Sequence, residues 1–202
     1  TYTASETIKT YGLGESTVAE MLGDLWKQVR PTVGTYAKRD GVHVVLRASG
    51  PDPEEVRATI STTAAQVRAL LGDAVWGSGS GTLAAWIGAL LRRSGYTIAT
   101  VEEATGGLLA MELRSTAAEQ FLGGVIGLGT PPVADLLLRV GPATPADNSG
   151  PSLTSCAVGL FEGDMEVATT RVQTPSSAAL ADRAAFAALD LLRRHMQGSA
   201  AS

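Results

Sequence analysis

The amino-acid sequence predicts an α/β protein in two parts, a small α+β unit followed by a three-layer α/β/α domain. Two observations predict this fold class. Short apolar and β-branched runs alternate with longer stretches whose apolar residues recur at helical spacing, which is typical of sheets covered by helices. A glycine- and serine-rich stretch at 77–81 has the composition of a linker. We therefore expect two domains, 1–77 and 78–202.

The first part is expected to follow the order β-α-β-β-α-β over about residues 7–77. Ser16 is placed to cap its first helix and Pro31 to end it. An Asp40-Gly41 pair between two strand-like runs predicts a hairpin. The expected elements are a strand at 7–11, a helix from 16 to about 28, strands at 32–38 and 42–48, a helix that starts within 51–55 and stops at Gly72, and a short strand at 74–76.

The second part is expected to mix helices and strands. Thr82 caps a helix that Gly95 closes, and Ser176 or Ser177 caps the last helix of the chain. Residues 141–152 have the composition of a loop. The other expected elements are strands at 97–101, 121–128 and 134–141, a helix at 108–113, and a hairpin that joins 153–161 to 165–172.

The composition excludes several classes of protein. Of the 202 residues, 45% are hydrophobic, which is enough to build a core and too many for a disordered chain. A net charge of −4 provides no basic surface for a nucleic acid. The single cysteine, Cys156, cannot form an internal disulfide, and no apolar run reaches the ~20 residues of a membrane span. With no signal peptide, we expect a cytoplasmic protein without nucleic-acid or membrane partners.

Residues 97–128 are the stretch around which the rest of the chain is expected to be organised. They predict a strand, a tight turn at Thr105-Gly106-Gly107, a helix and a second strand. In α/β units, binding sites lie just past the carboxyl end of a strand. Two glycines at a helix start bring backbone N–H groups close to whatever lies there, and the helix dipole favours an anion.

Two motifs in this stretch follow a known family pattern. The pattern reads A-E-S-C-T-G-G and then F-x-G-G-V-V-A-Y-S-N-x-x-K; this sequence has VEEATGG at 101–107 and FLGGVIGLGT at 121–130. The end of the last helix, AALDLLRRH at 187–195, also fits the pattern. The second part therefore resembles the carboxy-terminal domain of the CinA (competence/damage-inducible) family, which deamidates nicotinamide mononucleotide.

The first part is similar to the KH-like middle domain of the same family. That domain carries motifs close to F-G-I-G-E-S and P-T-V-A-x-Y-A-K, and here YGLGES stands at 11–16 and PTVGTYAK at 31–38. We find no basic G-x-x-G loop that would clamp a nucleic-acid backbone. The resemblance thus spans nearly the whole chain, but it does not add a nucleic-acid partner.

The resemblance also implies which positions carried the family's chemistry, and these positions are changed. The family's nucleophilic serine falls on Glu103, its neighbouring cysteine on Ala104, its tyrosine on Leu128 and its lysine near Val133. A segment between the second and third strands is missing, and only Gly141-Pro142 remains of a glycine-rich nucleotide loop. No residue is therefore assigned to catalysis, and the residues expected to contact a ligand are Thr105, Gly106, Gly107, Gly141 and Arg183.

These changes imply a pseudoenzyme, a CinA-family protein with a degenerate nicotinamide-nucleotide amidase-like domain that serves as a structural or dimerisation module. We expect a homodimer, no cofactor and, by resemblance, an upstream domain of the molybdopterin-binding type. Two alternatives remain open. One is a surviving nicotinamide mononucleotide deamidase, a C–N hydrolase, and the other is a non-catalytic module that binds a nucleotide.

The residues themselves offer weaker candidates for chemistry. Glu102 and Glu103 are adjacent carboxylates, but neighbours on a strand point to opposite faces and rarely converge on one atom. We expect Glu103 or Thr105 to cap the following helix, where a carboxylate at Glu103 would repel a ligand phosphate. Ser155 and Cys156 lie within a strand with no histidine placed by a motif, and no metal site is expected.

Overall fold

The computed structural model describes residues 1–146 and 153–199, and the chain divides into two compact units. Unit 1 comprises Thr1–Gly81 and unit 2 begins at Thr82. The division falls four residues after the boundary expected from the linker composition, because the last strand of unit 1 extends through Gly77 and Ser78.

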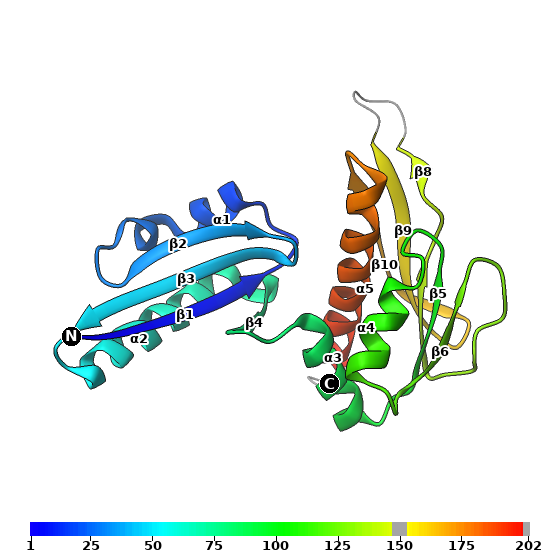
Figure 1. Ribbon diagram of the computed structural model, residues 1–202, viewed down its shortest axis with the longest axis horizontal. Helices are drawn as coiled ribbons and strands as arrows, with labels where there is room; N and C mark the ends of the chain where they lie inside the picture. The colour runs from blue at the N-terminus through cyan, green and yellow to red at the C-terminus, as the bar shows by residue number, and fades with distance from the viewer. Residues whose placement is uncertain (147–152, 200–202) are drawn as a thin grey trace. The chain divides into compact units, whose positions relative to one another are not determined.

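Unit 1 is a four-stranded antiparallel sheet with the strand order β2-β3-β1-β4 (Figure 1). The expected order β-α-β-β-α-β is confirmed. Its elements are β1 (Tyr2–Thr10), α1 (Glu15–Leu22), the 3-10 helix η1 (Gly23–Lys27), β2 (Thr32–Lys38), β3 (Gly41–Gly50), α2 (Pro53–Leu71), the 3-10 turn η2 (Gly72–Ala74) and β4 (Val75–Ser78).

The core of unit 1 lies between the sheet and its two helices. Alternate strand residues such as Val42, Val44 and Leu46 point inward, as the period of a strand requires. Val56, Ile60, Ala64, Val67 and Leu71 of α2 recur at helical spacing and cover them. Asp52 caps α2 by accepting a hydrogen bond from the N–H of Glu54.

Two elements of unit 1 differ from the sequence-based expectation. The first helix was expected to start at Ser16 and reach Gln28, but it starts at Glu15 and gives way to 3-10 geometry at Gly23. Gly23 adopts a φ of 52°, which an α-helix cannot continue through. The first strand starts at Tyr2 instead of residue 7, because it pairs with β3 along its whole length, from Tyr2 opposite Gly50 to Thr10 opposite Val42.

Unit 2 is built on one mixed sheet with the strand order β10-β9-β7-β5-β6, and β8 pairs with β9. Strands β7, β5 and β6 run parallel, whereas β9 is antiparallel to both β7 and β10. Its elements are α3 (Leu83–Ser94), β5 (Ile98–Glu102), α4 (Leu108–Thr116), β6 (Phe121–Ile126), β7 (Leu136–Val140), β8 (Thr144–Pro145), β9 (Thr154–Glu162), β10 (Met165–Thr174) and α5 (Ser177–Ser199).

Local sequence signals place the helices of unit 2. The hydroxyl of Thr82 accepts a hydrogen bond from the N–H of Ala85, and Gly95 closes α3 in a left-handed conformation. Ser176, one of the two expected caps, accepts a hydrogen bond from the N–H of Ala179 at the start of α5. Part of the expected loop, residues 147–152, lies outside the described residues.

The α/β class is confirmed, but the third layer expected for unit 2 does not occur within the described residues. Helices α3, α4 and α5 contact one another, and Figure 1 shows them on one side of the sheet. Residues 127–135 alone connect β6 to β7 across β5, and such a connection is too short to hold the usual crossover helix. The described residues of unit 2 therefore form two layers, the sheet and the helices that cover one of its faces.

Candidate functional site

The carboxyl ends of the parallel strands bring together the segments that the sequence singled out. The N–H of Glu103 donates to the carbonyl oxygen of Val140 at 3.0 Å, and that of Ala104 donates to Gly141 at 3.2 Å. The N–H of Gly127 donates to the carbonyl oxygen of Glu102 at 2.8 Å. The expected nucleophile positions and Gly141 therefore lie side by side at this edge of the sheet.

A buried carboxylate occupies the start of α4. The side chain of Glu102 is 1% exposed and accepts hydrogen bonds from five donors. Three of the donors are the backbone N–H groups of Gly107, Leu109 and Ala110, at 2.7–3.1 Å. The other two are the hydroxyls of Thr100, at 3.1 Å, and Thr105, at 2.7 Å. The anion that a helix N-terminus favours is thus supplied by the protein itself.

The backbone N–H groups of the turn before α4 are also hydrogen-bonded within the protein. The N–H of Gly106 donates to the carbonyl oxygen of Glu103, and that of Leu108 donates to Thr105. The N–H of Met111 makes the first regular helical bond, to Gly107. Together with the bonds to Glu102, every N–H from residue 106 to residue 111 has a partner within the protein.

Our expectation that Glu103 or Thr105 caps α4 is therefore wrong, since Glu102 does so. The side chain of Glu103 is exposed, and Glu103 lies in the bend that follows β5. Because Glu103 does not cap the helix, there is no longer a reason to expect that it repels a ligand phosphate at the helix start. In the structure, Glu102 is identified as the cap by its burial at the end of β5, two residues after the buried Thr100.

The expected ligand contacts are distributed over three elements. The Thr105 hydroxyl and the Gly107 N–H both bind Glu102, and Gly106 lies in the turn between them. Gly141 lies at the end of β7, beside Ala104. Arg183 lies on α5 with an exposed side chain.

The positions of the family's tyrosine and lysine carry exposed apolar side chains. Leu128 is 99% exposed and Val133 is 96% exposed. They follow β6, an edge strand of the sheet, whose Leu122 and Ile126 are 44% and 65% exposed. We call these four residues the β6 patch. Neither Leu128 nor Val133 has a group that accepts or donates a proton.

Cys156 and the two histidines of the chain, His43 and His195, are further side chains with groups that could take part in chemistry. Burial raises the pKa of the Cys156 thiol, and the positive charge of Arg171 opposes this only in part, so the thiol stays protonated at neutral pH. His43 Nε2 lies 2.8 Å from a carboxylate oxygen of Asp40, and His195 Nε2 lies 2.8 Å from Glu162. Among the described residues, no cluster of His, Cys, Asp and Glu side chains is arranged to hold a metal ion.

No described helix combines the length and the hydropathy that a membrane crossing requires.

Comparison with known proteins identifies the relatives of this chain. Residues 5–77 match the family described as the damage-inducible protein CinA KH domain. A CinA-like protein of Thermomicrobium roseum is 44% identical over 117 residues, which cover 57% of this chain and 29% of the relative. A CinA-like protein of Synechococcus sp. strain CC9902 is 35% identical over 173 residues, which cover 81% of this chain and 41% of the relative.

A solved structure of a CinA superfamily protein from Enterobacter cloacae aligns with a TM-score of 0.43 and 16% identity, over 58% of this chain and 95% of the solved one. The chain spans less than half the length of the two relatives described above. The KH match covers most of unit 1, and the alignment with the Synechococcus relative is long enough to extend into unit 2. With the CinA motifs found in both units, these matches show that the chain belongs to the CinA family.

Proposed function

We propose that this chain is a non-catalytic CinA-family module that associates with a second copy of itself through the β6 patch. The observation that carries the proposal is that the carboxylate of Glu102 accepts the hydrogen bonds of the N–H groups at the N-terminus of α4. Acyl transfer from an amide needs a nucleophile, a base and N–H groups that stabilise the oxyanion. At this edge of the sheet the N–H groups are already bonded, and Glu103, Ala104, Leu128 and Val133 supply neither a nucleophilic hydroxyl or thiol nor a lysine.

The β6 patch has the features of an association surface. Large apolar side chains that are almost fully exposed, such as Leu128 and Val133, expose area that association would remove from water. They adjoin an edge strand, whose outer N–H and C=O groups are open to pairing with another strand. Two β6 strands related by a twofold axis can pair antiparallel, which brings both patches to one interface.

The test is the oligomeric state of the full chain by light scattering over a range of micromolar concentrations. We expect a dimer for the native sequence and a monomer for Val133→Lys, because a lysine ammonium in an apolar interface loses its hydration without a partner. Val29→Lys is the matched control, since Val29 is 88% exposed but lies in unit 1. A monomeric native chain, or a dimer that Val133→Lys leaves intact, contradicts the proposed association.

The absence of catalysis is tested separately by the release of ammonia from nicotinamide mononucleotide. We expect no release above the buffer control with either the native chain or Glu103→Ala. Turnover that depends on Glu103 would show that the exposed carboxylate has replaced the family's serine, and the proposal would then be wrong.

A further inference from the structure

One face of the unit 1 sheet carries no helix among the described residues. Helices α1 and α2 pack on the other face, where the core lies. Because strand residues alternate between faces, the open face carries the odd-numbered residues of β1 and β3 and the even-numbered residues of β2. None of these residues is acidic, whereas Lys9, Lys38 and Arg47 are basic. We call this surface the open face of unit 1.

A small hollow lies on the open face, over β2 and β3. Gly34 is opposite Val45 and has no side chain, so the space above it is left unfilled. A Cβ added at Gly34 would lie 3.3 Å from the ring of Tyr36. The ring of Tyr36 thus stands at one end of the hollow and Arg47, opposite Thr32, at the other. The volume is about 220 Å³, and the lining residues are Thr32, Val33, Gly34, Tyr36, Val45 and Arg47.

The positive charge of Arg47 is not compensated within the described residues. Its side chain is exposed, and no described carboxylate forms an ion pair with it. Asp40, in the hairpin between β2 and β3, lies instead 2.8 Å from His43 and 3.9 Å from Lys9. The ammonium of Lys38 lies 5.9 Å from the centroid of the Tyr36 ring, which adds a second positive charge beside the hollow.

We propose that the open face of unit 1 binds an acidic peptide of a partner protein, with one glutamate side chain in the hollow and its carboxylate on Arg47. The planar fork of a guanidinium matches the two oxygens of a carboxylate, and charge-assisted bonds of this kind are the stronger hydrogen bonds in proteins. The methylene groups of the glutamate contact Val45 and the ring of Tyr36. This site is independent of the β6 patch and of any activity at Glu103.

The size and the charge of the surface favour a peptide over other anionic partners. The hollow is smaller than most sites for small molecules, roughly 300–1,000 Å³, so it suits one side chain of a larger partner. A nucleic acid is held by a row of cations along its phosphates. Apart from Arg47, the exposed cation on the described open face is Lys38, because Lys9 is buried. The hydroxyl of Tyr36, whose side chain is half exposed, is a further donor for a peptide carbonyl group.

Fluorescence anisotropy of a labelled peptide titrated with the full chain tests the proposal. The probe is a short peptide of alternating glutamate and threonine, and its neutral control has glutamine in place of each glutamate. A labelled single-stranded RNA that carries the same charge as the probe is the third ligand. We expect saturable binding of the glutamate peptide and none of the other two. A net charge of −4 on the chain gives the acidic peptide no general attraction, so its binding reports a local site.

Variants assign the binding to Arg47. Arg47→Gln should weaken the binding of the glutamate peptide by about tenfold or more, because it removes the charged contact. Arg57→Gln is the matched control, since Arg57 is an exposed arginine of α2, which covers the opposite face of the sheet, and its guanidinium lies over the ring of Tyr2 at 5.1 Å. It should bind like the native chain.

Gly34→Val keeps Arg47 and fills the hollow, so it separates a seat for a side chain from attraction by charge alone. Valine suits a strand, and the half-exposed ring of Tyr36 can rotate away from it. We expect Gly34→Val to abolish the binding of the glutamate peptide.

The proposal is overturned if the native chain does not bind the glutamate peptide, if it binds the glutamine peptide equally, or if Arg47→Gln and Gly34→Val bind as Arg57→Gln does. Binding of the RNA that Arg47→Gln removes would show that the open face recognises a nucleic acid, and the assignment of a peptide would be wrong.

Discussion

At the residue scale, Glu102 ties the end of β5 to the start of α4. Its buried carboxylate accepts hydrogen bonds from three backbone N–H groups and two hydroxyls. Such groups are costly to bury without partners, so the carboxylate and its donors stabilise one another. The same arrangement satisfies the helix N-terminus that would otherwise attract an anionic ligand.

Replacement of Glu102 by alanine should destabilise unit 2 strongly. Three N–H groups at the start of α4 and two hydroxyls would lose their acceptor, and we expect a loss of about 3 kcal/mol in the free energy of unfolding. Glu103→Ala, at an exposed neighbouring position, should change it by less than about 0.5 kcal/mol. Urea denaturation followed by circular dichroism measures both, and equal effects would contradict the assignment of the cap.

Asp135 should make stability depend on pH in the acid range. It accepts hydrogen bonds from the hydroxyl and the N–H of Thr97, at 2.6 Å and 2.7 Å, and these bonds lower the pKa of its carboxyl. A lowered pKa in the folded state means that the stabilisation is fully present above the unfolded pKa, near pH 4, and is lost as the pH falls through the folded value. Thermal melts from pH 6 to pH 2 should therefore show a smaller decline for Asp135→Asn than for the native chain. Parallel curves would contradict this.

At the element scale, the close contact of α3 with α4 depends on a glycine. A Cβ added at Gly88 would lie 2.2 Å from the backbone carbonyl oxygen of Thr116, which cannot move without shifting the end of α4. Alanine favours a helix over glycine by about 1 kcal/mol, so the substitution is destabilising only if the clash outweighs this gain.

We expect Gly88→Ala to lower the free energy of unfolding by about 2 kcal/mol, since overpacking of a contact typically costs more than the propensity gain. Gly198→Ala in α5 is the matched control, because a Cβ there meets no atom within 4 Å. It should be neutral or slightly stabilising. A Gly88→Ala variant that is as stable as the control would show that the two helices separate at little cost.

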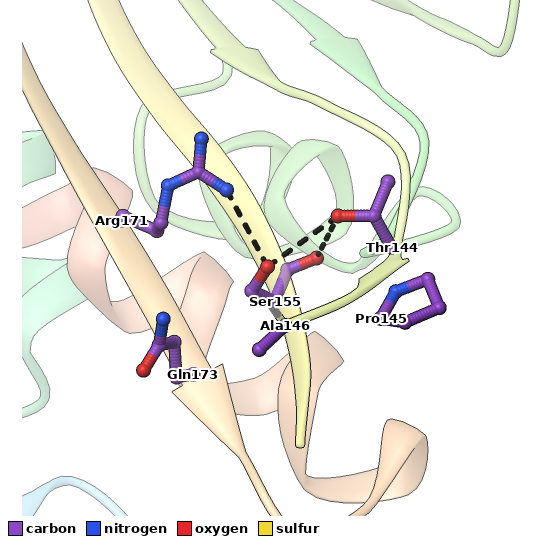
Figure 2. A pocket seen from close by; sticks show the side chains of 6 residues that line it. All are labelled: Thr144, Pro145, Ala146, Ser155, Arg171 and Gln173. Atoms are coloured by element: carbon purple, nitrogen blue, oxygen red, sulfur yellow. Dashed lines mark hydrogen bonds between the residues drawn. The ribbon is translucent and has the colours of Figure 1, made fainter. Parts of the chain in front are cut away.

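Most elements could be predicted from local sequence, and the exceptions have physical causes. Asp40-Gly41, Thr82 and Gly95 mark a hairpin and two helix ends by rules that act within a few residues. The length of β1 depends instead on β3, more than thirty residues away in sequence, which supplies its hydrogen bonds. The cluster of Thr144, Ser155 and Arg171 could not be predicted for the same reason, because only strand pairing brings these residues together (Figure 2).

At the scale of the whole molecule, the number of layers in unit 2 follows from the length of the segment that joins β6 to β7. A resemblance to an α/β/α domain led us to expect helices on both faces of the sheet. The nine residues from 127 to 135 pass between parallel strands without room for a helix, and α3, α4 and α5 lie together on one face. The edge of the sheet at β6 consequently carries exposed apolar residues, and self-association is the proposed means of covering them.

The last prediction concerns the double substitution Glu103→Ser and Ala104→Cys, which restores the family's nucleophile motif. The serine would stand at an exposed position at the end of β5, beside Gly141. Its hydroxyl would have no base, because Leu128 and Val133 are apolar and point into solvent. The N–H groups that could stabilise an oxyanion remain bonded to Glu102, so the removal of Glu103 frees no anion site.

We therefore expect no ammonia release from nicotinamide mononucleotide by the double variant, and no gain in phosphate binding at α4 by calorimetry. Deamidation above the buffer control would show that the hydroxyl is activated by groups other than those at Leu128 and Val133. A gain in phosphate binding by the double variant over the native chain would show that the helix start can exchange Glu102 for a ligand.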